Sequence, residues 1–205
     1  MKKSEYEGIL IAVDGPNGSG KTTIISKLNE LLEDKGYNVC ITKEPTETEL
    51  GRFVRQFAEE HEGLSLACLV AADRYEHVKN EIVPELKNGK IVITDRYILS
   101  SFILQEIDGV DTEFILNINS NIIKPDLQVA VRVEESILQE RLSERPILTR
   151  FEKNNQSCKE LFYMEKGIKT LHNENIVILE ICNDGNLQEN LNKIIASIEC
   201  MRRKY

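Results

Sequence analysis

Long hydrophobic runs are scarce in this sequence. The longest, Leu66 to Ala72, has seven residues, whereas a membrane-spanning helix needs about 20. The charged start of the chain leads into no apolar segment with the length and cleavage pattern of a secretory signal. We therefore expect a cytoplasmic protein with no membrane partner.

Cysteine is also sparse and shows no metal-binding pattern. The five cysteines are odd in number and none is in a C-x-x-C spacing, which argues against both a disulfide framework and a zinc site. They are Cys40, Cys68, Cys158, Cys182 and Cys200. We expect free thiols that are buried or partly buried, as is usual for cysteine.

Basic residues are outnumbered by acidic ones. The chain of 205 residues has 26 Lys plus Arg against 34 Asp plus Glu, a formal net charge of -8. This balance opposes a protein that binds nucleic acid by broad phosphate neutralisation, so we expect no nucleic-acid partner. It leaves room for a local cationic pocket that holds a small anionic ligand.

Short apolar runs alternate with helical periodicity along the chain. Continuous apolar runs such as 91–93 are typical of parallel strands that are covered on both faces. Strands are expected at 8–14, 37–43, 90–94, 127–133 and 176–181, and helices at 21–34, about 50–57, 64–87 with a kink or break at Pro84, 98–106, 111–122, 134–143, 157–172 and from 187 onward. No linker composition interrupts the pattern, so it predicts one α/β domain over 1–205 with a five-stranded, mostly parallel sheet.

The strongest motif lies between the first expected strand and the first expected helix. Residues 15–22 read G-x-x-x-x-G-K-[ST], the phosphate-binding P-loop. Its glycines let backbone N–H groups face an anion, Lys21 reaches the terminal phosphates, and the Thr22 hydroxyl can ligate Mg²⁺. The expected ATP-binding residues are Gly15, Pro16, Asn17, Gly18, Ser19, Gly20, Lys21, Thr22 and Thr23. The motif predicts a P-loop NTPase fold of three α/β/α layers with ATP and Mg²⁺ as cofactors, and the lack of an N-K-x-D segment opposes a GTPase.

Further short motifs follow in an order and at separations that resemble the thymidylate kinase family. They are Glu44-Pro45 with Thr48 and Arg55, Ala71-Ala72-Asp73-Arg74, Asp95-Arg96-Tyr97 with Ser100, Ser101 and Gln105, Pro125-Asp126-Leu127, and Arg141 with Arg145 and Arg150-Phe151-Glu152. The first three resemble the family segments R-E-P-G-G-T, F-A-A-x-R and D-R-Y-x-x-S-S-x-A-Y-Q. The last two resemble its last core strand and its basic lid, expected here at about 144–157. The resemblance runs from Gly8 to about Glu152 and is weak beyond it.

This resemblance implies a homodimeric kinase that transfers the γ-phosphoryl of ATP to a nucleoside 5′-monophosphate, with dTMP to dTDP favoured. The implied catalytic residues are Lys21, Asp95, Arg96, Arg145 and Arg150, with Asp95 positioning Mg²⁺ through water. The implied acceptor-binding residues are Glu44, Arg55, Val70, Arg74, Arg96, Ser101, Leu104 and Gln105. The resemblance places Arg55 and Arg96 nearest the acceptor phosphate and Arg74 nearer its base, and it implies that Arg145 and Arg150 close over ATP from the lid. The acceptor phosphate is already largely a dianion at neutral pH, so such a reaction needs no general base.

Several positions depart from the family pattern, mostly on the acceptor side. Val70 stands where a phenylalanine usually stacks on thymine, and Leu104 where a tyrosine usually lies beside the sugar. Asn17 replaces a frequent acidic residue. Further departures are Lys43 for arginine, Thr46-Glu47 for a double glycine and Glu106 for a common glycine.

Three alternatives remain open at this point. The chain could be a related kinase acting on another nucleotide or a small phosphorylated acceptor, or an ATP-binding regulatory module without transfer activity. A deoxynucleoside kinase would need Glu44 as a base. Arg141 could be a solvated helix residue or a lid residue and is left out of the site. The three histidines, His61, His77 and His172, are read as surface or helix residues without metal spacing.

Overall fold

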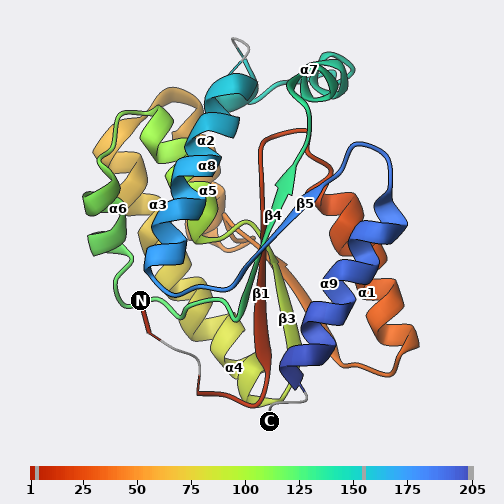
Figure 1. Ribbon diagram of the computed structural model, residues 1–205. Helices are drawn as coiled ribbons and strands as arrows, with labels where there is room; N and C mark the ends of the chain where they lie inside the picture. Colours follow the sequence, from red (N-terminus) through yellow and green to blue (C-terminus); the bar gives the residue numbers. More distant parts are fainter. Residues whose placement is uncertain (3–4, 154–155, 203–205) are drawn as a thin grey trace.

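The protein is built on one parallel sheet, seen in a computed structural model that describes residues 1–2, 5–153 and 156–202 (Figure 1). The strand order is β2-β3-β1-β4-β5, and every neighbouring pair is parallel. The strands are β1 (Ile9–Asp14), β2 (Val39–Lys43), β3 (Ile91–Asp95), β4 (Leu127–Arg132) and β5 (Ile178–Cys182). The predicted α/β fold with a five-stranded parallel sheet is confirmed.

Helices cover both faces of this sheet, giving three layers (Figure 1). One face carries α1 (Lys21–Asp34) and α9 (Leu187–Arg202). The other side of the molecule holds α2 (Glu49–Glu60), α3 (Gly63–His77), α4 (Val83–Lys87), α5 (Ile98–Ile107), α6 (Thr112–Ile118) and α8 (Ser157–Asn173). The helix α7 (Glu135–Ser143) lies above the carboxyl ends of the strands, followed by a short 3₁₀ turn, Arg150–Glu152.

The central strand β1 shows why the sheet is buried on both faces. Its side chains alternate, so Leu10 and Ala12 join the core under α5 and α8, whereas Ile11 and Val13 join the core under α1 and α9. All six residues of β1 are buried. A continuous apolar run is therefore required here, as the sequence predicted.

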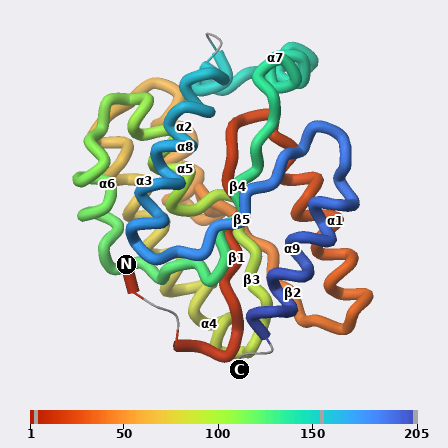
Figure 2. Tube along the Cα trace, in the orientation of Figure 1, coloured from red at the N-terminus to blue at the C-terminus, as the bar shows by residue number. Residues whose placement is uncertain are grey.

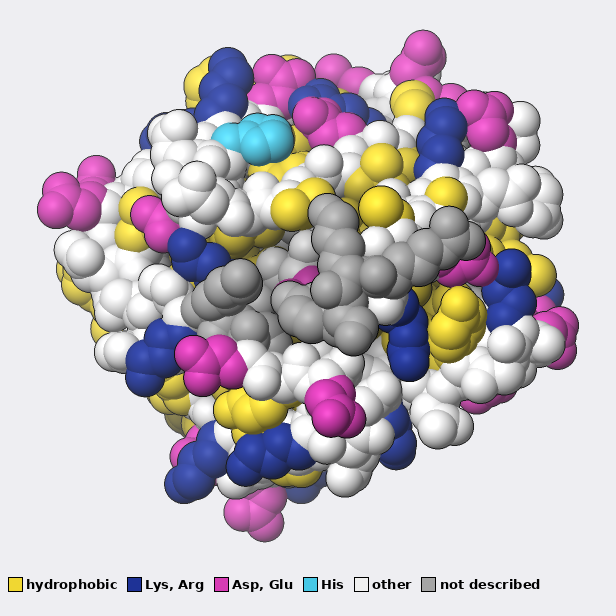
Figure 3. Space-filling model, turned by 60° about the horizontal axis from the view of Figure 1, so that its bottom comes forward, with side chains coloured by type: hydrophobic (Ala, Val, Ile, Leu, Met, Phe, Trp, Pro, Cys, Tyr) yellow, Lys and Arg dark blue, Asp and Glu magenta, His cyan; other side chains and the backbone are white. Residues whose placement is uncertain are grey.

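The start of the chain lies beside the segment that follows α6 (Figure 2). Lys2 forms a parallel bridge with Ile123. At this end of the molecule, where the strands begin, acidic and basic side chains are interspersed over the visible face (Figure 3). None of the helices within the described ranges is long and apolar enough to cross a membrane.

Two helix predictions were only partly right. The expected helix 64–87 is divided into α3, a π-helical turn at Val78–Ile82 and α4, so the irregularity lies just before Pro84, whose ring cannot continue a regular hydrogen-bond ladder. The expected helix 111–122 ends earlier, at Ile118. There Asn119 turns its amide back to the Ile115 carbonyl at 2.8 Å and accepts from buried Arg74.

The expectation that the cysteines are buried or partly buried was wrong for four of the five, whereas His77 lies on a helix as expected and is buried. Among the described cysteines, Cys40 is half-buried and the other four are exposed, because they lie on outward positions of helices and at the edge strand β5. His77, read as a surface or helix residue, is indeed on α3 but only 2% exposed. Its ring nitrogens contact Thr42 Oγ1 at 2.7 Å and a Glu44 carboxylate oxygen at 3.1 Å.

Close packing of α5 against α8 predicts the effect of one small substitution. A Cβ added to Gly167 on α8 would lie 2.8 Å from both Leu99 Cδ1 and Phe102 Cβ of α5. Gly167→Ala should gain about 1 kcal/mol of helix propensity but lose roughly 1–3 kcal/mol to overpacking. We therefore expect lower stability in urea unfolding.

The exposed residue Lys169 on the same helix supplies the control. Lys169→Ala should leave the unfolding midpoint within experimental error. A Gly167→Ala protein more stable than the parent would contradict the packing argument.

Candidate functional site

The P-loop joins β1 to α1 at the carboxyl edge of the sheet, where ligands bind in open α/β folds. Gly18 and Gly20 adopt positive φ angles of 81° and 87°, a region that glycine enters without steric cost. A Cβ on Gly15 would lie 2.4 Å from the Val131 carbonyl oxygen of β4. The glycines are thus required by backbone conformation and by close packing on the next strand.

Lys21 lies inside the P-loop. Its Nζ donates to the carbonyl oxygens of Gly15 at 3.0 Å and Pro16 at 2.9 Å. The side chain is 7% exposed; burial, and next the positive charge of Arg96, lower the pKa of Lys21 to about 7. An anion bound in the loop would therefore favour the charged form of a lysine that the protein has already removed from water.

Thr22 and Asp95 meet beside this lysine. Thr22 Oγ1 donates to Asp95 Oδ2 at 3.1 Å, and Asp95 stands at the end of β3. The other carboxylate oxygen, Asp95 Oδ1, is buried and has no hydrogen-bond partner. A hydroxyl next to an unsatisfied carboxylate oxygen fits Mg²⁺, which is usually held by one or two carboxylates together with waters and substrate phosphates.

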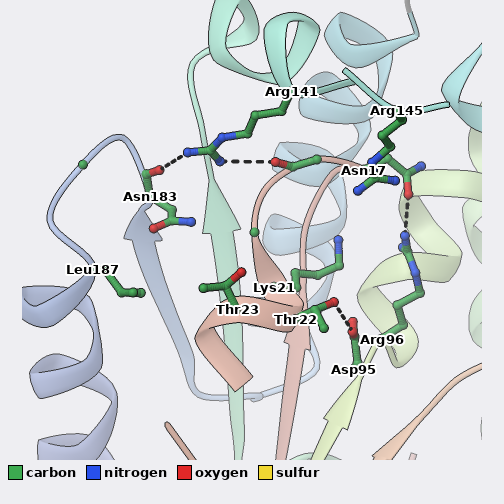
Figure 4. Close-up of a pocket in the computed structure, with 13 residues that line it drawn as sticks. Asn17, Lys21, Thr22, Thr23, Asp95, Arg96, Arg141, Arg145, Asn183 and Leu187 are labelled. Carbon is green, nitrogen blue, oxygen red and sulfur yellow. Dashed lines mark hydrogen bonds between the residues drawn. The ribbon is translucent and has the colours of Figure 1, made fainter. Parts of the chain in front are cut away.

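A first cavity of about 660 Å³ opens over the P-loop (Figure 4). Its basic side chains are Lys21, Arg96, Arg141 and Arg145, and Asp95 is an acidic residue in the same lining. This local excess of positive charge contrasts with the acidic chain as a whole and suits a polyphosphate. The full lining is Asn17, Gly18, Gly20, Lys21, Thr22, Thr23, Asp95, Arg96, Arg141, Arg145, Asn183, Gly185 and Leu187.

A second cavity of about 260 Å³ lies between α2, α3 and α5. All the residues expected on the acceptor side line it, namely Glu44, Arg55, Val70, Arg74, Arg96, Ser101, Leu104 and Gln105. Its wall also includes Thr149 and Phe151 from the lid segment. The structure therefore brings together the predicted acceptor residues, which span about 60 positions from Glu44 to Gln105. Their individual roles stay predictions.

Arg74 and Glu44 form a buried pair at the base of the second cavity. Arg74 Nε donates to Glu44 Oε2 at 2.7 Å, and both side chains are at most 4% exposed. The remaining guanidinium nitrogens donate to Asn119 Oδ1 at 2.8 Å and the Tyr97 carbonyl at 3.0 Å. Arg74 is thus held rigidly, and its predicted contact with an acceptor base would be made by an already oriented guanidinium.

Arg55 lines the same cavity but is held more loosely. Its Nη2 donates to Glu47 Oε2 at 3.1 Å, and Nη1 donates to the Pro45 carbonyl. The side chain is 37% exposed. A partly exposed guanidinium on this wall is free to reorient toward a phosphate, consistent with the role predicted for it.

Asn17 and Arg96 line both cavities. Arg96 Nη2 donates to Asn17 Oδ1 at 2.6 Å (Figure 4). Arg96 has a φ of 73°, which is uncommon for a residue other than glycine. Such strain is often found at functional sites, and here it turns the guanidinium back over the P-loop.

Buried Asp14, at the end of β1, fixes the turn that carries Arg96. Asp14 Oδ1 accepts from the backbone N–H groups of Tyr97 at 2.9 Å and Ser100 at 3.0 Å. Asp14 Oδ2 accepts from Gln128 Nε2 of β4 at 2.9 Å. One carboxylate therefore ties β1 and β4 to the start of α5, a link that the sequence analysis did not include.

The two expected lid arginines lie in different places. Arg145 follows α7, lines the first cavity and pairs with Glu152. Arg150 does not line the first cavity; its Nη1 and Nη2 donate to the two carboxylate oxygens of Asp108, each at 2.8 Å. Its Nε donates to the Ala58 carbonyl at 2.7 Å.

In this structure a bidentate acidic partner at the end of α5 holds the Arg150 guanidinium beside the second cavity, and its closure over ATP stays a prediction. The predicted lid, about 144–157, also includes residues 154 and 155, which lie outside the described residues.

Two parts of the first cavity were missed from the sequence. Arg141, left out of the predicted site, donates to the Gly18 and Asn183 carbonyls, both at 3.2 Å (Figure 4). Asn183 follows β5 and donates from Nδ2 to the Ser19 carbonyl at 2.9 Å. Asn183 could have been predicted from the sequence, since it lies just after an expected parallel strand and the carboxyl ends of such strands gather at one edge of the sheet.

The fold and this site define a P-loop nucleotide-binding protein of the kinase type, with a second cavity adjoining the phosphate loop. The family model described as thymidylate kinase matches residues 13–194. The chain belongs to the thymidylate kinase family.

Curated relatives agree with this assignment. The chain is 43% identical to a probable thymidylate kinase of Pyrococcus horikoshii over 156 residues, 71% of this chain and 75% of the relative. It is 44% identical to a thymidylate kinase of Caldicellulosiruptor saccharolyticus over 144 residues, 66% of this chain and 70% of the relative. A probable thymidylate kinase of Thermococcus kodakarensis is 32% identical over 199 residues, 84% of this chain and 97% of the relative.

Proposed function

We propose that the protein is an ATP-dependent thymidylate kinase that converts dTMP to dTDP. The observation that supports this most directly is that two cavities adjoin through Asn17 and Arg96. One is built on the P-loop and the other on the residues of the acceptor side. Two phosphorylated ligands placed in them would meet at that shared wall.

The chemistry requires alignment more than proton transfer. The acceptor phosphate attacks the γ-phosphorus, a P–O bond forms, and the bond to the ADP oxygen breaks. Since the acceptor is already a dianion near neutral pH, the protein must hold two anionic groups in line and compensate their charge. Arg96 at the shared wall and Lys21 in the loop are positioned for this, and Arg145 adds charge from the lid side.

The proposal includes Mg²⁺ because Thr22 and Asp95 offer oxygen ligands of the kind that this ion prefers. The unsatisfied Asp95 Oδ1 is the feature that fits the ion or one of its waters. When bound, the ion would supply charge compensation for the terminal phosphates. The Thr22 and Asp95 contact at 3.1 Å keeps both groups on one side of the loop.

A homodimer is proposed on the family resemblance. Helices α2 and α3, which flank the acceptor cavity, expose the large apolar side chains Phe53 and Leu64 by 50% and 58%. Light scattering at several concentrations would establish the assembly state. A monomer at every concentration would remove this part of the proposal without affecting the kinase reaction.

A panel of nucleoside monophosphates in a coupled ADP-release assay tests the proposed function. We expect turnover of dTMP, with a KM higher than that of family members that carry aromatic side chains at the positions of Val70 and Leu104. Val70 and Leu104 line the acceptor cavity without an aromatic face or a hydroxyl, and stacking contributes about 0.5–1.5 kcal/mol beyond buried area. The kcat/KM for a monophosphate with a bulkier base, or for a ribonucleotide, should be comparable to or higher than that for dTMP.

The double variant Val70→Phe/Leu104→Tyr is the matched test, and it should lower KM for dTMP selectively. A low-micromolar KM for dTMP in the parent protein, with no turnover of UMP, dUMP or purine monophosphates, would show that other residues supply these contacts. Absence of ADP release with every acceptor would instead support a binding module without transfer activity.

A further inference from the structure

A buried carboxylate on α8 contacts the P-loop. Glu160 is 2% exposed. Its Oε2 accepts from the Asn17 backbone N–H at 2.7 Å, and its Oε1 accepts from Asn17 Nδ2 at 3.0 Å. These two bonds join segments 143 positions apart in the sequence, so α8 fixes both the backbone and the side chain of one P-loop residue.

The hydrogen-bond directions leave one orientation for the Asn17 amide. A carboxylate only accepts and a guanidinium only donates. Because Glu160 accepts from Nδ2, the Oδ1 atom faces the other way, where it accepts from Arg96 Nη2 at 2.6 Å. Arg96 Nη1 in turn donates to Ser100 Oγ at 3.2 Å. The chain of contacts therefore runs from α8 through the P-loop to the wall shared by both cavities.

The fold of α8 does not itself call for a carboxylate at this position. Met164, Ile168 and Leu171 bury the helix in the main core, and burying a carboxylate is costly unless it is paired. Burial raises the pKa of Glu160, while the two Asn17 bonds and then the charges of Arg96 and Lys21 oppose that rise. The buried carboxylate is thus stabilised by the P-loop site rather than by its own helix.

We propose that Glu160 is a positioning residue, which orients the Asn17 amide so that Asn17 in turn holds Arg96 at the wall between the two cavities. This inference rests on the proposed kinase function. Glu160 itself does not line either cavity, so it acts through Asn17 and not by touching a nucleotide.

A hydrogen-bond polarity swap tests this. In Glu160→Gln, one carboxylate oxygen is replaced by an NH₂ group, so two donors face each other at Asn17 Nδ2. If the Asn17 amide flipped to remove this repulsion, its own NH₂ group would then face Arg96, which also only donates. In Asn17→Asp, two carboxylates face each other. The double variant Asn17→Asp/Glu160→Gln restores all three contacts and keeps the net charge of the site. Only the side-chain contact between residues 17 and 160 has its donor and acceptor exchanged, because the residue 17 backbone N–H and Arg96 still donate.

We expect each single variant to raise KM for dTMP and lower kcat/KM by about tenfold or more, the effect of losing a hydrogen bond to a charged group. KM for ATP should change less, because the remaining P-loop contacts are intact. The double variant should recover to within about threefold of the parent. Glu165→Gln, at an exposed position of the same helix that pairs with Arg132, is the control and should match the parent.

Measurements without turnover separate this inference from the proposed function. NMR should show a perturbed backbone amide at residue 17 in each single variant and its recovery in the double variant. The thermal unfolding midpoint should likewise fall in each single variant and recover in the double variant. Equal KM and an unshifted amide in Glu160→Gln, or no recovery in the double variant, would overturn the positioning role. A parent protein that does not phosphorylate dTMP, but whose amide signals follow the swap, would reject the proposed function and leave the positioning contact in place.

Discussion

Lys21→Ala is expected to abolish measurable phosphoryl transfer while the protein stays folded. Removing one preorganised donor to developing charge commonly lowers kcat by about 10²–10³-fold, and Lys21 is the cation enclosed by the loop itself. Its Nζ is held by the Gly15 and Pro16 carbonyls, so the lysine also shapes the loop. Initial rates with saturating ATP and dTMP, together with far-UV circular dichroism, measure the effect.

Lys27→Ala is the matched control on the same helix. Lys27 is exposed and forms an ion pair with the exposed Glu30 at 2.8 Å. This variant should retain parental kcat and KM. Parental turnover in Lys21→Ala itself would mean that phosphoryl transfer does not depend on the P-loop.

The second large effect is expected at Arg145. Arg145 lines the first cavity and its side chain is 45% exposed, so it can approach a transferred phosphoryl group. Arg145→Ala should lower kcat by something on the order of the 10³–10⁵-fold typical of arginine fingers, less if Arg141 shares the task. Single-turnover kinetics would separate this loss from a change in product release.

Arg150→Ala is the informative comparison for Arg145→Ala. Arg150 is bound to Asp108 beside the acceptor cavity, so its loss should raise KM for dTMP with a smaller change in kcat, and Asp108→Asn should act in the same direction. If Arg150→Ala instead lowers kcat as much as Arg145→Ala, then Arg150 must leave Asp108 and reach the phosphates during turnover.

The fold could be predicted largely because each element carries a local signal. Helix α1 begins and ends where the motif and the periodicity placed it, at Lys21 and Asp34. The break in the helix 64–87 was expected from Pro84, but the π-helical turn that replaces regular structure at Val78–Ile82 depends on packing. Likewise, α6 ends early because of the buried contact between Asn119 and Arg74, which is distant in sequence.

The candidate site was predictable where a motif fixed the local geometry. The P-loop residues and the acceptor-side residues gather around two cavities as the ordered motifs implied. Arg141 was left out of the predicted site, and the closure of Arg150 over ATP stays a prediction, because the positions of both depend on how α7 and the lid segment pack over the sheet. Glu160 has no local signal at all, since its contact with Asn17 exists only in the folded chain.

The buried Asp14 has a consequence for how such an enzyme can diversify. It anchors the turn of Arg96 to β1 and β4, so the place where the two phosphates are proposed to meet is tied to the core. The side chains predicted to contact the base include Val70, on α3, and Leu104, on α5 beyond the turn that Asp14 anchors. Mutational paths toward a new acceptor can therefore alter base recognition in single steps while the machinery of transfer is inherited unchanged.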